Sequence, residues 1–415
     1  MSIAEQPKQK GRAETISGLR DIMPGSSACI ERALETVRAH LGMDVAFVSE
    51  FIGEDRIFRY VDSKTGRSPI KVGDVLSLQD GYCRKVVDGE LPALISDTAV
   101  VPGALAIPAT HAIPIGAHVS VPLRLADGRL YGTFCCFSFE PDHSLNERDL
   151  RFFRIFADIV AYQLEESLLA VQSTSERASR IHRALEAGEP AMLFQPVVIC
   201  PDMEIAAAEA LARFGGEPRR PPDQWFAEAG EVHLRVELER QAIRNALRAF
   251  RPIWARHPLY LSLNSSPETI IRGDLAALFA DYPTERIVLE ITEHDYVEDY
   301  DGLRAALAPL RASGVGIAID DAGSGYASMR HILNIAPDYI KLDISLTRSI
   351  DTDPMRRALA SALITFASQT DSKIAAEGVE TAAELETLRG LGVAVAQGYH
   401  LHRPMPADRL LDLLP

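Results

Sequence analysis

Short apolar runs alternate with amphipathic helical segments from about residue 181 to the end of the sequence, and this alternation constrains the fold most. Helical periodicity fills several of the intervals between the runs, for example from Leu234 to Phe250. Eight strands with mostly helical crossovers predict a TIM-type barrel, and a doubly wound sheet is the alternative. The strand candidates are Met192–Val198, Glu204–Leu211, Leu259–Leu263, Ile287–Glu290, Ile317–Asp320, Tyr339–Leu342, Lys373–Ala376 and Val393–Ala396.

Polar residues stand at the carboxyl ends of these runs. In a barrel, the carboxyl ends of the strands converge on one face, where active sites lie. One such glutamate is usually a solvated strand terminus, but the recurrence at seven strand ends argues against that interpretation. Carboxylate and amide oxygens suit hard divalent cations, so the pattern predicts a metal site. The residues are Glu209, Asn264, Glu290 with Glu293, Asp320 with Asp321, Lys341 with Asp343, Glu377, and Gln397.

The two adjacent aspartates, Asp320 and Asp321, need a special backbone if they are to share one site. Adjacent residues of a strand point to opposite faces, so the chain must become irregular where this strand ends. The glycines that follow, Gly323 and Gly325, would permit such a conformation.

The run Glu209-Ala210-Leu211-Ala212-Arg213 resembles the signature of the EAL family of cyclic di-GMP phosphodiesterases. The resemblance extends over essentially all of residues 181 to 412 and assigns 183–415 to an EAL domain with an α/β TIM-like barrel. The other motifs that carry it are Gln195-Pro196, Leu263-Asn264-Ser265-Ser266-Pro267, Glu290-Ile291-Thr292-Glu293, Asp320-Asp321-Ala322-Gly323-Ser324-Gly325-Tyr326, Lys341-Leu342-Asp343, Glu377-Gly378-Val379-Glu380 and Gln397-Gly398-Tyr399.

This resemblance implies the hydrolysis of cyclic di-GMP to linear pGpG with two Mg²⁺ or Mn²⁺ ions. Phosphodiester hydrolysis needs an activated water and charge neutralisation, which two divalent ions can supply. The implied ligands are Glu209, Asn264, Glu290 and Asp320 for one ion, and Asp320 with Asp321 for the other. The implied catalytic group is Glu209, Lys341, Glu377 (a further ligand or the general base) and Glu293, which holds the aspartate loop. The implied substrate contacts are Gln195, Arg213, Asp343 and Gln397.

Two positions depart from the family pattern. Ala322 stands where a phenylalanine usually follows the two aspartates, and Leu401-His402-Arg403-Pro404 replaces an aromatic-containing ending. We expect the first change to alter loop rigidity or dimer contacts, and the second to affect guanine contacts. Every implied ligand is present, which favours an enzyme over a degenerate EAL domain that binds cyclic di-GMP without cleaving it. The sequence contains no GGDEF-type cyclase segment.

The N-terminal part has a different pattern: helix, hairpin, helix, loop, hairpin and long helix. This order predicts an α+β domain with an antiparallel sheet, and a loop or lid-like segment at Pro102–Ala112. The segment resembles a GAF domain, which we assign to 14–168. That resemblance implies a sensor for an unidentified small-molecule or redox signal, and a homodimer. The motifs that carry it are Leu78-Gln79-Asp80-Gly81-Tyr82-Cys83, Leu91-Pro92-Ala93-Leu94-Ile95-Ser96-Asp97, Ser120-Val121-Pro122-Leu123 and Tyr131-Gly132-Thr133-Phe134.

The cysteines of this domain have two possible meanings. Cys83 is either a redox or ligand-attachment residue or, as we expect, a small buried apolar side chain. Cys135 and Cys136 are adjacent in a strand and point to opposite faces, so they should not bind one metal together. His111 and His118 flank the end of the loop, and the alternatives for them are a place facing a pocket or, as we expect, the surface.

Composition limits the cellular setting and the partners. The 415 residues carry a formal net charge of -15, which argues against binding to nucleic acid or an anionic membrane. Five cysteines without a CxxC spacing indicate a reducing cytoplasm. No stretch is apolar enough for a membrane span. We expect a disordered tail at 1–13 and a helical linker at 169–182, which is polar and lacks proline.

Overall fold

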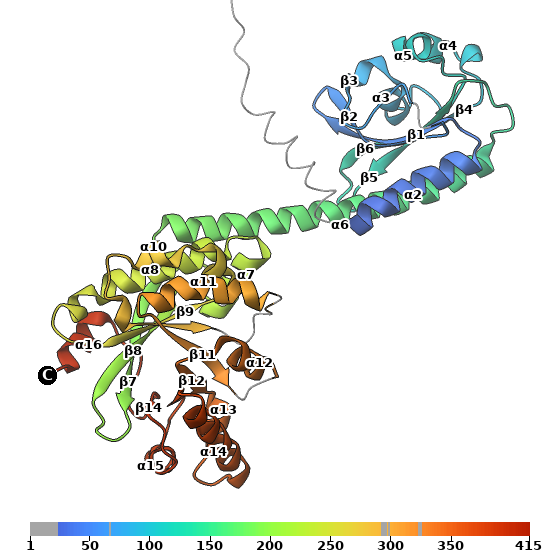
Figure 1. Ribbon diagram of the computed structural model, residues 1–415. Coiled ribbons are helices and arrows are strands. Elements are labelled where there is room, and N and C mark those ends of the chain that lie inside the picture. The colour runs from blue at the N-terminus through green and yellow to red at the C-terminus, as the bar shows by residue number, and fades with distance from the viewer. Residues whose placement is uncertain (1–23, 66–67, 292–296, 298, 323–325) are drawn as a thin grey trace, which may run out of the picture. The chain divides into compact units, whose positions relative to one another are not determined.

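The chain divides into two compact units, Met1–Ser173 and Thr174–Pro415, and the division falls inside one long helix, α6 (Glu147–Glu186) (Figure 1). The computed structural model describes residues 24–65, 68–291, 297, 299–322 and 326–415. The tail expected at 1–13 lies outside these residues. The segment expected to be a helical linker, 169–182, is part of α6.

The first unit is built on a six-stranded antiparallel sheet with the order β3-β2-β1-β6-β5-β4, as the sequence predicts for a GAF domain. Its strands are β1 (Val45–Ile52), β2 (Asp55–Ser63), β3 (Val75–Ser77), β4 (Leu94–Ile95), β5 (Ala117–Arg124) and β6 (Leu130–Ser138). Its helices are α2 (Pro24–His40), η1 (Leu78–Asp80), α3 (Tyr82–Val87), η2 (Thr98–Val100), α4 (Pro102–Leu105), α5 (Pro108–Ala112) and the first part of α6.

Each face of this sheet has its own apolar core. Phe134 and Cys136 lie in the core that α2 and α6 cover, whereas Cys135 and Phe137 lie in the core that contains residues of α3 and α4. Cys135 and Cys136 therefore point to opposite faces, as their adjacency predicts. Cys83 is buried in the same core as Cys135.

Two expectations for this unit are wrong. Pro102–Ala112 contains two short helices, α4 and α5, in place of a loop; each begins with a proline at its first position, and each is too short to show helical periodicity. His118 is 2% exposed, because the helical layer covers the start of β5 and buries its otherwise polar face. His111 is exposed, as expected.

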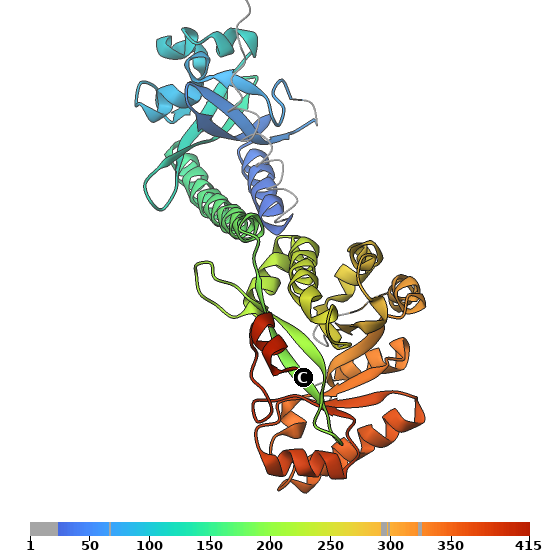
Figure 2. The ribbon, with the colours of Figure 1, turned by 90° about the vertical axis from the view of Figure 1, so that its left-hand side faces the viewer.

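The second unit is a closed barrel with the strand order β10-β11-β12-β13-β14-β7-β8-β9, which confirms the TIM-like barrel and excludes the doubly wound sheet. Figure 2 shows this unit, coloured from green to red, with helices on the outside of its strands. All eight predicted strands are present: β7 (Ala191–Ile199), β8 (Ile205–Arg213), β9 (Tyr260–Ser265), β10 (Ile287–Ile291), β11 (Gly316–Ala322), β12 (Tyr339–Leu342), β13 (Lys373–Ala376) and β14 (Val395–Ala396). The helices around them are α7 (Pro222–Glu231), α8 (Arg235–Trp254), α9 (Pro267–Arg272), α10 (Leu275–Phe279), η3 (Thr284–Arg286), α11 (Tyr300–Ala312), α12 (Tyr326–Ile335), α13 (Ile344–Thr347), α14 (Pro354–Gln369), α15 (Ala382–Gly390) and α16 (Ala407–Leu413).

The first barrel strand runs against its neighbours. β7 pairs antiparallel with both β8 and β14, while the other neighbouring strands pair in parallel. The connection from β7 to β8 is a tight turn, and a turn of that length can only reverse the chain.

The main core of this unit lies between the strands and the surrounding helices. Leu261, Leu289, Ile317 and Ile340 are completely buried there. A cavity of about 300 Å³ lies inside the barrel, lined by small side chains such as Ala207 and by larger ones such as Tyr260 and Tyr339. No helix in the described part of the chain has the length and apolar character that crossing a bilayer requires.

Gly398, which follows β14, packs closely against the backbone of Val379. A Cβ atom at this position would overlap the backbone of Val379, so Gly398→Ala should lower the free energy of unfolding of this unit by roughly 2 kcal/mol or more. Gly390→Ala is the matched control, because a Cβ there meets nothing within 4 Å. Both tryptophans, Trp225 and Trp254, belong to this unit, so urea unfolding followed by tryptophan fluorescence reports on it alone. Equal unfolding midpoints for the two variants would contradict the prediction.

Candidate active site

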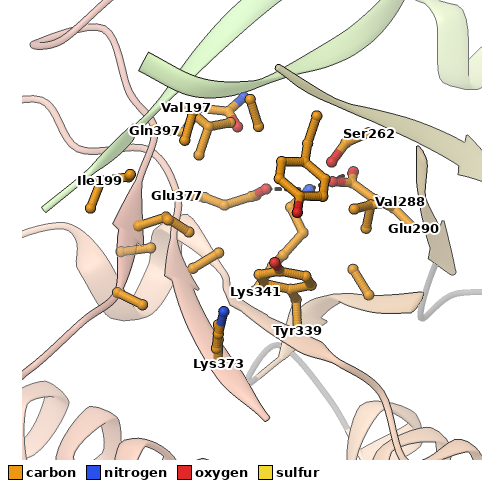
Figure 3. A pocket seen from close by; sticks show the side chains of 18 residues that line it. Val197, Ile199, Ser262, Val288, Glu290, Tyr339, Lys341, Lys373, Glu377 and Gln397 are labelled. Atoms are coloured by element: carbon orange, nitrogen blue, oxygen red, sulfur yellow. Dashed lines mark hydrogen bonds and ion pairs between the residues drawn. The ribbon is translucent and has the colours of Figure 1, made fainter. Parts of the chain in front are cut away.

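Lys341 lies at the centre of a group of acids that come from different barrel strands. Its Nζ atom is 2.7 Å from Glu290 Oε2, 3.1 Å from Asp320 Oδ1, 2.5 Å from Glu377 Oε1 and 3.7 Å from Glu209 Oε2. Figure 3 shows the Glu290 and Glu377 side chains reaching Lys341 from two sides. The lysine is 4% exposed, so these carboxylates replace its hydration.

Glu209 is held by amide groups on both of its oxygens. Asn264 Nδ2 donates to Oε1 at 3.0 Å, and Gln397 Nε2 donates to Oε2 at 2.8 Å. The same Gln397 amide donates to Gln195 Oε1 at 3.0 Å, and Gln195 donates to the carbonyl of His402. The two glutamines expected to contact substrate are thus bonded to each other, and Gln397 bonds directly to the expected metal ligand.

The backbone becomes irregular where β11 ends, as two aspartates in one site require. Asp321 takes a positive φ of 55°, and the register with β12 shifts between Ile319 and Ala322. Aspartate is one of the residue types that tolerate this conformation, so Asp321 itself makes the turn that the sequence assigned to the following glycines. Carboxylate oxygens of Asp320, Asp321 and Glu377 consequently lie within 4.8 Å of one another.

Burial and mutual repulsion set the protonation of this cluster. Burial, together with the negative charges of Asp320 and Glu209, raises the pKa of Glu377 to about 8 even though Lys341 opposes the shift. Burial likewise raises the pKa of Glu290 well above its usual range. For Glu209, the charge of Lys341 and the amide bonds outweigh the burial, and the pKa is lowered. The four carboxyl groups around Lys341 therefore outnumber the single positive charge that the lysine supplies.

A cleft of about 700 Å³ reaches the acids from the carboxyl ends of β8 and β9. Its polar lining includes Asn264 and Asp321, the further acids Asp223 and Glu239, and the two arginines Arg213 and Arg235. The cavity inside the barrel reaches Glu290, Lys341 and Glu377 from the opposite side, but most of its lining is apolar. The size and the arginines make the larger cleft the candidate site for an anionic ligand.

The structure brings together most residues that the sequence singled out. Two of the expected substrate contacts do not touch the acidic group through any contact in the described chain. Arg213 lines the cleft, and Asp343 caps α13 through the amide of Ser345 at 2.9 Å. Glu293 lies outside the described residues. The residues that form one connected group are Glu209, Asn264, Glu290, Asp320, Asp321, Lys341, Glu377, Gln195 and Gln397.

Helix α8 contributes to the cleft, which no motif in the sequence indicates. Arg235 and Glu239 line it, and Glu239 accepts hydrogen bonds of 2.8 Å from the amide and hydroxyl of Ser266. Glu239 shares a helical stripe with the cleft-lining Ala242 and Ala246. A charged residue on an otherwise apolar helical stripe is the sequence signal that would have identified the contribution of α8 to the cleft.

Comparisons with known proteins agree with the two-unit description. Residues 178–404 match the EAL domain family, and residues 26–165 match the GAF domain family. The chain is 27% identical to the bifunctional diguanylate cyclase/cyclic di-GMP phosphodiesterase MucR of Pseudomonas aeruginosa, covering 72% of this chain and 44% of MucR. It is 30% identical to the probable cyclic di-GMP phosphodiesterase PdeD of Escherichia coli, covering 54% of this chain and 43% of PdeD. The chain thus spans less than half the length of either relative.

A solved structure of the MucR phosphodiesterase in complex with cyclic di-GMP resembles the second unit. It is 29% identical, has a TM-score of 0.51, and covers 57% of this chain and 99% of that chain. An EAL enzyme, Bd1971, bound to cAMP and cyclic di-GMP has a TM-score of 0.56 over 90% of this chain, at 18% identity. The latter likeness concerns the fold alone.

The raised pKa of Glu377 makes the metal-free protein sensitive to pH. A group that is protonated more readily in the folded state stabilises the fold below its unfolded pKa of 4.5, and this stabilisation is lost as the pH rises towards about 8. In the presence of EDTA, the melting temperature of the second unit should therefore fall from pH 5 to pH 8. In Glu377→Gln the fall should be smaller, because the amide has no proton to lose.

Tryptophan fluorescence during thermal unfolding at several pH values measures this dependence. Glu204→Gln is the control, since Glu204 is exposed and directly precedes β8, outside the acidic group. A Glu377→Gln variant whose melting temperature follows the wild-type pH curve would rule the explanation out.

Proposed function

The chain belongs to the EAL domain family, and from this membership and its site we propose that it is a metal-dependent phosphodiesterase that hydrolyses cyclic di-GMP to linear pGpG. The observation that carries the proposal is the buried group of Lys341, Glu209, Glu290, Asp320 and Glu377 beside a cleft with two arginines. A phosphodiester with two guanine bases needs an anion-binding cleft of this size next to its reactive centre.

The acidic residues fit divalent cations. Their carboxyl groups outnumber the lysine, burial raises the pKa of Glu290 and Glu377, and three of the acids offer oxygens within 4.8 Å of one another. Such a set is tolerated best around a bound cation. The proposed ligands are Glu209, Asn264, Glu290 and Asp320 for one Mg²⁺ or Mn²⁺, and Asp320 with Asp321 for a second. Bound ions of this kind supply an activated water and neutralise phosphate charge.

The protein's own groups have separate proposed tasks. Arg213 is exposed and lines the cleft, where its planar fork of donors suits a substrate phosphate. Gln397 and Asn264 fix the orientation of Glu209, and Lys341 holds several carboxylates in place and stabilises negative charge. The proximity of Glu377 to both aspartates favours a ligand over a general base.

Regulation by the GAF domain and pairing of two chains belong to the same proposal. The support for pairing is a stripe of apolar side chains on α6: Ile155, Ile159, Tyr162 and Leu169 are 59%, 44%, 60% and 60% exposed. They recur at steps of four, three and seven residues, the spacing with which two helices pack against each other. A second copy of this chain carries the same stripe and would cover it.

Glu209→Ala tests the enzymatic proposal. Loss of this carboxylate should lower cyclic di-GMP hydrolysis in Mg²⁺ or Mn²⁺ more than about 100-fold. Loss of a residue that only hydrogen-bonds to a metal ligand already lowers activity about 10–100-fold, and Glu209 is a proposed ligand itself. Chromatography of the nucleotides measures pGpG formation directly. Glu204→Ala, five residues earlier and exposed, should retain wild-type turnover. If the wild-type chain binds cyclic di-GMP without forming pGpG, the protein is a binding module and the proposal fails.

The double variant Ile159→Glu/Leu169→Glu tests the pairing of α6. Charges on both positions should shift the chain from dimer to monomer, because like charges would face each other across the helix pair. Light scattering after size exclusion measures the molar mass. Val100→Glu is the matched control, since Val100 is 73% exposed on the first unit but lies outside α6. A wild-type chain that is monomeric at micromolar concentrations would overturn this part of the proposal.

A further inference from the structure

Two cysteines of the first unit lie close together without forming a disulfide. Cys83, in α3, and Cys135, in β6, are both buried, and their Sγ atoms are 3.7 Å apart. A disulfide has an S–S distance of about 2.05 Å, so rotation of the side chains over a short distance would join them. Ser120 Oγ lies 3.0 Å from Cys135 Sγ and holds the second thiol in position. The neighbouring Cys136 points into the other core of the sheet.

Arg56 gives the two thiols different chemistry. Its guanidinium is 5% exposed and donates to Cys83 Sγ at 2.8 Å. Among the described residues it also lies over the ring of Phe58, and no carboxylate contacts it. A buried cation requires a nearby anion, and the Cys83 thiolate is the group in position to provide it. The hydrogen bond from Cys135 and the charge of Arg56 hold the pKa of the Cys83 thiol well below its usual range, whereas burial raises that of Cys135.

A small cavity borders on Arg56 and on Tyr82, the residue before Cys83, while neither cysteine lines it. Its volume is about 30 Å³, enough for one or two water-sized molecules, and its lining includes Arg56, Tyr82 and His118. Arg56 Nε and His118 Nδ1 are buried without a hydrogen-bond partner. Burial and the nearby Arg56 lower the pKa of His118 to about 3, so His118 is neutral and adds no second charge. The cavity therefore suits a small polar molecule that can hydrogen-bond to Arg56.

We propose that Cys83 and Cys135 form a reversible disulfide within the chain when a hydroperoxide reaches the Cys83 sulfur beside Arg56, which makes the first unit a thiol-based peroxide sensor. The Cys83 sulfur attacks one peroxide oxygen and the O–O bond breaks. The distal oxygen takes up a proton from solvent and leaves as an alcohol, or as water from hydrogen peroxide, and Cys83 becomes a sulfenic acid. The Cys135 sulfur then bonds to Cys83 Sγ and water leaves. Two thiols are oxidised and one peroxide is reduced.

The disulfide removes the negative charge that Arg56 contacts. The guanidinium then remains buried with neutral sulfur beside it, which is unfavourable. Gly81 packs directly against this guanidinium, so the start of α3 is the segment that must adjust. Oxidation should therefore increase amide hydrogen exchange in α3, from Tyr82 to Val87.

The experiment treats the reduced full chain with hydrogen peroxide, blocks free thiols with N-ethylmaleimide, and analyses peptides without reduction. The expected product is a Cys83–Cys135 peptide pair two hydrogens lighter than the dithiol, restored by dithiothreitol, while Cys136 and Cys200 stay alkylated. Arg56→Met should slow its formation about tenfold or more, since one pKa unit changes the thiolate fraction about tenfold. Arg56→Lys should retain most of the rate, and Cys136→Ala should match the wild type.

Other oxidation patterns would overturn the proposal. It fails if Cys83 stays reduced while Cys136 or Cys200 is oxidised, if Cys83 proceeds to sulfinic acid with Cys135 free, or if the disulfide joins two chains. Should Arg56→Met fail to fold, iodoacetamide labelling of the wild-type chain tests the activation of Cys83 by Arg56, because Cys83 should react faster than Cys200 although both are buried. The readout is the state of the cysteines and does not depend on phosphodiesterase activity.

Discussion

A buried lysine surrounded by carboxylates is the interaction on which the second unit depends. Lys341 cannot stay charged at 4% exposure unless anions replace its water, and it contacts acids from β8, β10 and β11 and the acid that follows β13. Each acid in turn would repel its neighbours without the lysine. The contacts exist only when these strands lie in one register, so closing the barrel and assembling the site are the same event.

The sequence predicts this barrel well because its strands are buried on their outer side. Runs such as Ile287–Glu290 are apolar enough to stand out, and each ends in a polar residue that belongs inside the site. The direction of β7 was not foreseen, since an apolar run gives a strand but not its orientation. The tight turn between β7 and β8 contained that information. The prediction of metal ligands came from family motifs, and their roles remain proposals.

The first unit shows where sequence reasoning fails. His118 and Ser120 alternate with the apolar Val119 and Val121, a pattern typical of a strand with one face in water. That face is covered where β5 begins and exposed near its end, and only the packing of the helices decides which part is buried. Arg56 in β2 is a second example. An arginine in an alternating strand resembles a solvent-facing residue, yet Arg56 is buried. Polar residues that a tertiary contact buries give no local signal, and here they surround the cysteine pair.

Ala322, which departs from the family pattern, directly follows the two aspartates of the site. Its side chain is completely buried in the barrel core, and its position pairs with Leu342 of β12. A phenylalanine at this position would fix the end of β11 through a large buried ring, and alanine offers far less apolar surface for that purpose. The conformation of Asp320 and Asp321 must then rest more on the pairing with β12 and on the contact between Asp320 and Lys341. The same lysine that collects the acids thus also fixes the strand end that presents two of them.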